Sequence, residues 1–107
     1  MSIVTNLVGR TWMIKMSGRF DFLVHLEFKQ SYEGMLNNPE IREIEVDMQH
    51  LDFLDSTALG MLMLLRERAL VVSKPIVLSN PSSNVFKLLD VANFDKLFLT
   101  KGWGAAK

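Results

Sequence analysis

The residues most able to carry chemistry are three neighbours, Asp55, Ser56 and Thr57, at the predicted start of a long helix. The first N–H groups of a helix are unpaired and its dipole is positive there, so this end accommodates a phosphate group. A phosphate on Ser56 would add nearly two negative charges close to Asp55. The alternative interpretation is structural, since any one of the three can cap the helix and stabilise it by about 1 kcal/mol. The residues themselves leave open a modifiable hydroxyl and a helix cap.

The helix predicted over residues 57–72 is apolar nearly all round in its first two turns. A core stripe is complete at spacings of four and three residues, yet further apolar residues lie off it before the charges begin at Arg66. Either both faces are covered by the protein, or one face is an exposed patch of the kind that binds a partner. At Gly60 another backbone can approach closely. The stripe consists of Ala58, Leu62, Leu65, Ala69 and Val72, and the residues off it are Leu59, Met61, Met63 and Leu64.

Catalytic and metal-binding patterns are absent from the sequence. The chain has no cysteine, which excludes disulfides, thiolate metal sites and a cysteine nucleophile. His25 and His50 lie in different predicted elements without metal-ligand spacing. The acidic residues of the segment 43–47 alternate with apolar ones, and we interpret them as the solvated face of a strand. We therefore expect no enzyme activity, no cofactor and no metal.

Composition narrows the class of protein further. The chain has 107 residues, 49% of them hydrophobic and 22% charged, which is typical of one globular domain. Twelve basic residues balance twelve acidic ones, so no overall field attracts nucleic acid or anionic lipid. No apolar stretch approaches the roughly 18 residues of a membrane span, and the N-terminus does not resemble a signal peptide. We expect a cytoplasmic protein with no nucleic-acid partner and no direct membrane insertion.

The hydrophobic patterns predict elements in the order β-β-α-β-α-β-α-β. Strands alternating with helices indicate an α/β fold, in which a mixed sheet has parallel later strands joined by right-handed crossovers. The predicted elements are strands 3–8 and 11–17 with a break at Gly18–Phe20, a helix from Asp21 to near Gly34, strand 43–48, helix 57–72, strand 76–78, a helix opened by Asn80 and Pro81 with Val85, Leu88, Leu89 and Ala92 on its apolar face, an edge strand at 97–99, and a frayed tail over 102–107.

Two motifs resemble the STAS domain of bacterial anti-sigma factor antagonists. The segment 55–60, DSTALG, is similar to the family signature D-S-[ST]-[AG]-L-G, and the segment 18–21, GRFD, is similar to its G-x-x-D after the second strand. Supporting matches are Val46-Asp47, Leu54-Asp55, Asn80-Pro81-Ser82 and Leu88-Leu89. The resemblance covers residues 3–100. It implies a single STAS domain over 1–107, a mixed sheet with helices packed against it.

The resemblance also implies a partner-switching mechanism. An unphosphorylated antagonist binds an anti-sigma factor or another regulator, a serine kinase separates the pair, and a metal-dependent, PP2C-like serine phosphatase restores it. Carried to this sequence, the acceptor is Ser56, with Asp55 and Asp21 beside it and Thr57 as the next hydroxyl in line. The segments 17–22, 58–62 and 64–66 look most like Gram-negative antagonists that answer to a regulator with kinase and phosphatase activity.

The implied docking face lies on the helix that follows the acceptor serine. Its residues are Leu59, Gly60, Met61, Met63 and Leu64. A monomer is the simplest state for an interface reserved for exchange. The alternative within the same fold is a constitutive STAS subunit of a membrane lipid-transport ABC complex, which would need a permanently covered patch and no dependence on Ser56.

Overall fold

The computed structural model describes residues 2–106, and over this range the chain forms a five-stranded sheet with helices against it. The strands lie in sequence order, β1 antiparallel to β2 and every later neighbour parallel, which confirms the predicted mixed sheet and element order. The elements are β1 (Ser2–Val8), β2 (Thr11–Phe20), η1 (Phe22–Val24), α1 (His25–Glu33), β3 (Glu43–Leu54), α2 (Ser56–Val71), β4 (Ile76–Ser79), α3 (Ser83–Val91), η2 (Phe94–Lys96), β5 (Leu99–Lys101) and η3 (Trp103–Ala106).

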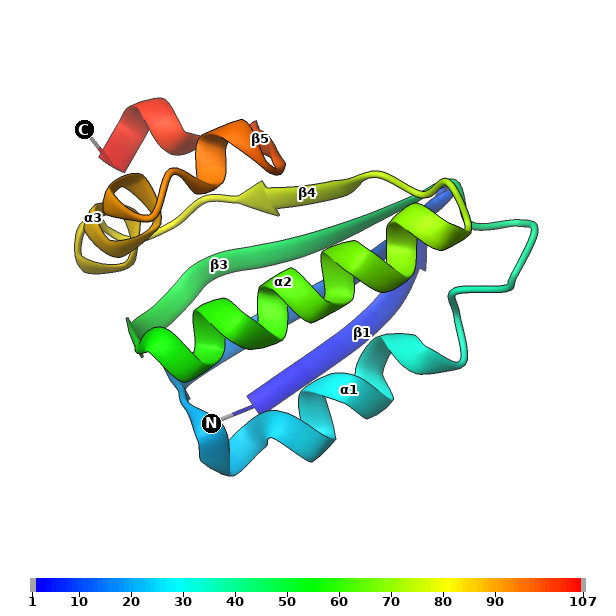
Figure 1. The fold of residues 1–107 in the computed structure, drawn as a ribbon, viewed down its shortest axis with the longest axis horizontal. Coiled ribbons are helices and arrows are strands. Elements are labelled where there is room, and N and C mark those ends of the chain that lie inside the picture. Colours follow the sequence, from blue (N-terminus) through cyan, green and yellow to red (C-terminus); the bar gives the residue numbers. More distant parts are fainter. Residues whose placement is uncertain (1, 107) are drawn as a thin grey trace.

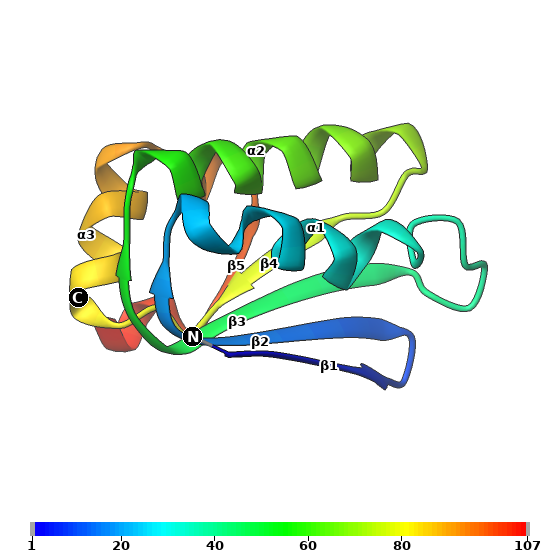
Figure 2. The ribbon, with the colours of Figure 1, turned by 90° about the horizontal axis from the view of Figure 1, so that it is seen from below.

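The helices divide between one face and one end of the sheet. Figure 2 shows α1 and α2 side by side on the same face, with α3 at the end of the sheet where β4 leads into it. The predicted core stripe of α2 is confirmed for Ala58, Leu62, Leu65 and Ala69, which are fully buried, whereas its last member, Val72, is half-buried and follows the end of the helix. The hydrophobic core lies between the sheet and all three helices, since α1 and α3 also contribute buried residues. The start of α2 lies beside the start of the η1–α1 segment (Figure 1).

The strands of the N-terminal half are longer than their patterns indicated. Gly9, at φ +63°, turns β1 directly into β2 with Val8 paired to Thr11, which is the geometry of a two-residue hairpin turn. The predicted break at Gly18–Phe20 is wrong, since β2 continues to Phe20. Gly18, at φ +87°, instead lies beside a register shift in the pairing with β3, which bends the strand without ending it. Likewise β3 runs past residue 48 to Leu54, so only Asp55 separates it from α2.

The interpretation of the acidic residues in β3 as solvated is wrong for Glu45. Its side chain is buried, at 6% exposure, and its Oε2 accepts a hydrogen bond of 2.7 Å from the Ser79 hydroxyl of β4. The Lys101 ammonium lies 3.9 Å from its other oxygen. A buried carboxylate needs such partners, and here they come from the two strands next in the sheet.

The C-terminal third departs most from the predictions. Asn80 does not cap α3: it adopts a left-handed conformation at φ +54°, and Ser82 is the residue before the helix. The last strand is Leu99–Lys101 and not 97–99, because the N–H groups of Leu97 and Phe98 bond back to the Phe94 carbonyl in the turn that follows η2. On α3, Leu88 is exposed. Near the C-terminus, Trp103 is buried and its Nε1 donates 2.7 Å to the Leu78 carbonyl, so at that residue the predicted frayed tail is wrong; Lys107 lies outside the described residues.

Candidate functional site

Two aspartates begin neighbouring helices at the same end of the sheet. Phe20 of β2 and Leu54 of β3 are paired in the parallel ladder, so Asp21 and Asp55, which follow them, leave the sheet side by side. Asp21 accepts a hydrogen bond of 3.0 Å from the Leu23 N–H and caps η1. Asp55 accepts one of 3.0 Å from the Ala58 N–H and caps α2. The sequence motifs that contain these aspartates, 34 positions apart, therefore meet at one edge.

The two hydroxyls after Asp55 are in different situations. Thr57 Oγ1 donates to Asp55 Oδ1 at 2.5 Å, and this bond, followed by that from the Ala58 N–H, holds the pKa of the Asp55 carboxyl below its usual range. Ser56 is the first residue of α2 and is exposed; among the hydrogen bonds between residues 2 and 106, none uses its hydroxyl. Asp55 thus caps the helix and the Thr57 hydroxyl is bonded to it, which leaves Ser56 as the free hydroxyl.

A groove of about 300 Å³ lies between α2 and the η1–α1 segment, directly beside Thr57. Gly60, Met61 and Leu64 form its α2 wall, one to two turns beyond Ser56. Phe28 and Tyr32 are among its α1 residues, and both are buried. Burial raises the pKa of the Tyr32 hydroxyl. The groove is mainly apolar, although it opens next to two carboxylates and a free hydroxyl.

Two exposed apolar side chains, Phe22 and Leu64, line this groove, and the same η1–α1 segment exposes two more, Leu23 and Leu26. The three residues of that segment were not predicted. Phe22, Leu23 and Leu26 are 59%, 88% and 57% exposed, and Leu64 of α2 is 42% exposed. The exposure of the η1–α1 residues was not predicted, because the pattern of this segment was interpreted only as a core-facing stripe. That stripe consists of Val24, Phe28, Tyr32 and Met35. The signal was present in the sequence, since an apolar pair directly follows Asp21 and a third apolar residue lies off that stripe.

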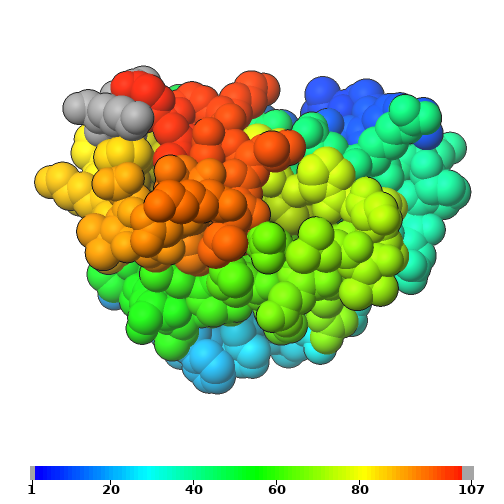
Figure 3. Space-filling model, turned by 45° about the horizontal axis from the view of Figure 1, so that its top comes forward, coloured from blue at the N-terminus to red at the C-terminus, as the bar shows by residue number. Residues whose placement is uncertain are grey.

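The remaining predicted docking residues, Leu59 and Met63, lie elsewhere on α2. Both are half-buried and pack against the core, and neither lines the groove. They share the opposite flank of the helix with Arg66, whose Nε donates 2.7 Å to the Leu97 carbonyl before β5. Figure 3 shows α2, in green, at the surface between α1 in cyan and this C-terminal segment in orange. The structure thus places Gly60, Met61 and Leu64 together and separates Leu59 and Met63 from them.

Two carboxylates, Asp55 and Asp21, lie at and beside the start of α2, and Lys29 of α1 lines the groove. Asp21 has one cationic neighbour, Arg19, whose Nε lies 3.7 Å from Asp21 Oδ2 while its guanidinium stacks 4.1 Å from the Phe53 ring centre. His25 stacks on Phe22 at 4.3 Å and its Nδ1 lies 2.8 Å from the Phe22 carbonyl. Over residues 2–106 no group of three histidine or acidic side chains is arranged to hold a metal ion.

Comparison with known proteins shows the family. The family model described as "Mlab, STAS domain" matches residues 3–101. A STAS-domain containing protein of Pseudomonas aeruginosa (strain UCBPP-PA14) is 42% identical over 90 residues, which cover 84% of this chain and 87% of that protein. The chain belongs to the STAS-domain family.

Solved structures agree on the fold. The anti-sigma factor antagonist SpoIIAA in its unphosphorylated form superposes with a TM-score of 0.79 at 19% identity, over 92% of this chain and 87% of that chain. A putative anti-sigma factor antagonist from Thermotoga maritima gives a TM-score of 0.82 at 16% identity, over 92% and 85%. The Bacillus SpoIIAA has also been solved in the phosphorylated form. That structure superposes with a TM-score of 0.72 at 16% identity, over 92% of this chain and 90% of that chain. Within residues 2–106, no helix has the length and apolar character to cross a bilayer.

Proposed function

We propose that this chain is a phosphorylation-controlled partner-switching regulator, an anti-sigma factor antagonist with Ser56 as its phosphorylation site. In the unphosphorylated state it binds an anti-sigma factor, or a response-regulator kinase/phosphatase, through the groove beside Ser56. A serine kinase disrupts the complex and a PP2C-like phosphatase restores it. The observation that carries the proposal is the free, exposed Ser56 hydroxyl next to an apolar groove with an exposed apolar border.

The electrostatics of the site explain how a phosphate would act. Ser56 follows Asp55 directly, and Asp21 leaves the neighbouring strand. A phosphate on Ser56 would add nearly two negative charges, which repel acidic groups of the partner. Removing water from these charges at an apolar interface also costs free energy. Like-charge contacts at interfaces cost several kcal/mol, and each 1.4 kcal/mol is tenfold in affinity. The free N–H groups at the start of α2 accommodate the phosphate, so the fold is retained while the interface is lost.

Intact-mass analysis of the protein from its native cell, with peptide mapping across residues 52–66, tests the modification. A gain of about 80 Da on Ser56, the mass of one phosphate group, supports the switch. A phosphate found only on Thr57 contradicts the choice of acceptor. A chain that stays unmodified under growth and stress conditions alike argues for the alternative, a constitutive subunit of a lipid-transport ABC complex.

Binding to the co-purified partner tests the consequence. Ser56→Asp should weaken binding at least tenfold with little change in melting temperature. Ser83→Asp is the matched control, because Ser83 is also an exposed first residue of a helix, α3. Ser83→Asp should bind like the unmodified chain. Equal binding by both variants would show that charge at Ser56 does not control the complex.

A second pair of variants tests the groove. Met61→Asp places a charge in its α2 wall and should abolish binding with little loss of stability, because Met61 is half-buried and lies off the core stripe. Val71→Asp is the matched control at the far, exposed end of the same helix. A large loss of stability in Met61→Asp would identify this residue as part of the core.

A further inference from the structure

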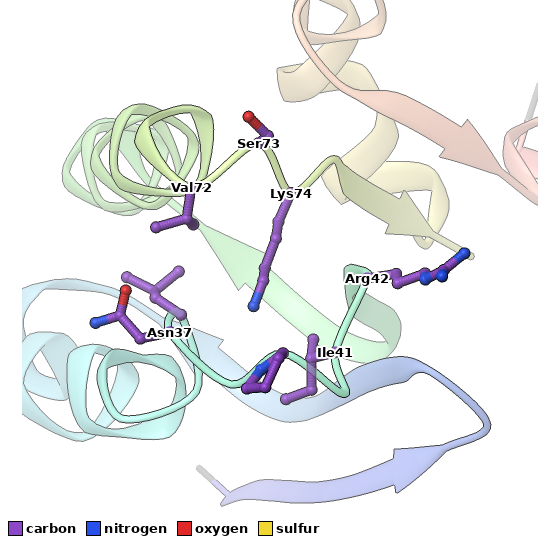
Figure 4. A pocket seen from close by; sticks show the side chains of 8 residues that line it. Asn37, Ile41, Arg42, Val72, Ser73 and Lys74 are labelled. Carbon is purple, nitrogen blue, oxygen red and sulfur yellow. The ribbon is translucent and has the colours of Figure 1, made fainter.

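A second hollow, of about 590 Å³, lies at the end of α2 remote from Ser56. One wall is the loop that joins α1 to β3 and the other is the segment leaving α2, which lie together at the same end of the molecule (Figure 1). Figure 4 shows the side chains of both walls, with Lys74 pointing across from the α2 side toward the loop. The partner-switching proposal makes no use of this hollow.

Backbone hydrogen bonds and one arginine hold the two walls in place. The loop is closed by the Ile41 N–H on the Asn38 carbonyl at 3.1 Å, and the Arg10 guanidinium donates 3.3 Å to the carbonyls of Pro39 and Glu40. The other wall is fixed by the Lys74 N–H, which donates 2.9 Å to the Ala69 carbonyl. The hollow is therefore formed before any ligand arrives, as most small-molecule sites are.

Lys74 carries a buried positive charge that lacks a carboxylate. The residue is 8% exposed, and its Nζ donates 2.7 Å to the Asn38 carbonyl. An ammonium group has three donors, and for Lys74 no acidic oxygen of residues 2–106 lies within 4.0 Å. Aspartate and glutamate are missing from the lining, to which Arg42 adds a second cation. Because buried charges are normally paired, this arrangement favours an anion from outside the chain.

Besides the two cations, Asn37 and Ser73 add polar side chains to the lining, and its other residues are apolar. Leu36 and Ile41 are buried and Val72 is half-buried, and all three line the hollow. We propose that the hollow binds a small organic anion, with its carboxylate or phosphate on the Lys74 ammonium and its apolar body against Leu36, Ile41 and Val72. A bare inorganic ion could bind the Lys74 ammonium but has no apolar body to contact the apolar side chains.

Titrations of the full chain, followed by backbone amide chemical shifts, test the site. The probes are phenyl phosphate and benzoate, with benzyl alcohol as the uncharged analogue and inorganic phosphate as the bare anion, all at constant ionic strength. We expect saturable chemical-shift changes confined to residues 35–42 and 72–76 for one or both organic anions. Tighter binding of phenyl phosphate would indicate a phosphate ligand, and tighter binding of benzoate a carboxylate. Benzyl alcohol and inorganic phosphate should bind at least tenfold more weakly. No saturation up to about 10 mM, far above a 1 mM dissociation constant, would overturn the proposal.

Variants separate the ammonium from general surface charge. Lys74→Met keeps the apolar stem and removes the charge, and should weaken binding at least tenfold. Lys87→Met removes an exposed lysine of α3 and should leave binding unchanged. Since Lys74→Met also loses the bond to Asn38, Arg42→Gln is the second variant, at an exposed side chain, and should weaken binding roughly threefold through charge loss alone. Unchanged affinity in Arg42→Gln and in any folded Lys74→Met would overturn the proposal.

Discussion

Gly60 is the position where stability and the proposed function conflict most clearly. It lies inside α2, where glycine is about 1 kcal/mol less favourable than alanine. A Cβ added to Gly60 meets nothing within 4 Å, so the substitution introduces no clash. Gly60→Ala should therefore stabilise the protein by about 1 kcal/mol and raise its melting temperature by roughly 4–8 °C. Urea denaturation with an unchanged slope measures the gain.

The same methyl group should weaken partner binding. Gly60 lines the groove beside Thr57, Met61 and Leu64, one turn after Ser56, and a partner packed against it would be displaced. Overpacking of a close contact costs about 1–3 kcal/mol, which is roughly a 5- to 140-fold loss of affinity, measured by isothermal titration. Glu67→Ala, at an exposed position two turns along the same helix, is the control and should change neither quantity appreciably.

The two readouts refute different parts of the reasoning. A destabilised Gly60→Ala would mean that the space above Gly60 is filled or that its backbone is not helical. A stabilised variant that binds its partner normally would remove Gly60 from the docking face. Such a result would leave Ser56 phosphorylation to be judged by mass analysis.

Three further substitutions test the fold and the cap. Asp55→Ala should destabilise the protein by about 1 kcal/mol at pH 7 through loss of the α2 cap. The Thr57 hydroxyl and then the Ala58 N–H hold the pKa of Asp55 below its unfolded value, so the ionised carboxylate stabilises the fold at pH values above the unfolded pKa. As the pH falls through the lowered pKa, this contribution is lost. The difference in free energy of unfolding between wild type and Asp55→Ala, measured by urea denaturation, should therefore shrink. Leu62→Ala, at a fully buried position, should lose about 2–5 kcal/mol, and a loss below 1 kcal/mol would place α2 differently on the sheet. Gly102→Ala should lose more than 1 kcal/mol by calorimetry, since φ is +74° there and the new Cβ overlaps the Asn80 side chain; an unchanged melting temperature would argue against the left-handed conformation.

Helix α2 shows what local patterns can predict. Its core stripe repeats at three- and four-residue intervals over four turns, so the periodicity alone identifies the buried residues, and the structure buries Ala58, Leu62, Leu65 and Ala69. Strand β4 could also be predicted from its sequence, because a short run of branched apolar residues between two helices is typical of a strand buried on both faces. Both elements depend on features that lie within a few residues of one another.

Three of the wrong predictions, for Glu45, Asn80 and the C-terminal tail, share a different cause. Glu45 alternates with apolar neighbours as a solvated residue does, yet Ser79 and Lys101 of later strands cover and pair it. Asn80 is a good cap in isolation, but its backbone N–H donates 2.8 Å to the Lys101 carbonyl and its conformation is left-handed. Trp103 near the C-terminus is held by Leu78. In each case the decisive partner lies more than 20 positions away in the chain.

In the candidate site, too, the features set by adjacent residues could be predicted, and those set by distant residues could not. The sequence by itself determined the capped helix start, with Ser56 between Asp55 and Thr57, and the excess of apolar residues on α2, because capping and helical periodicity are properties of adjacent residues. Only the tertiary structure decided that Asp21 stands next to Asp55 and that η1 and α1 close the groove, with the exposed Phe22 in its wall. It also separated Gly60, Met61 and Leu64 from Leu59 and Met63, since a neighbour on one flank of a helix is chosen by the register of the sheet beneath it and not by the helix itself.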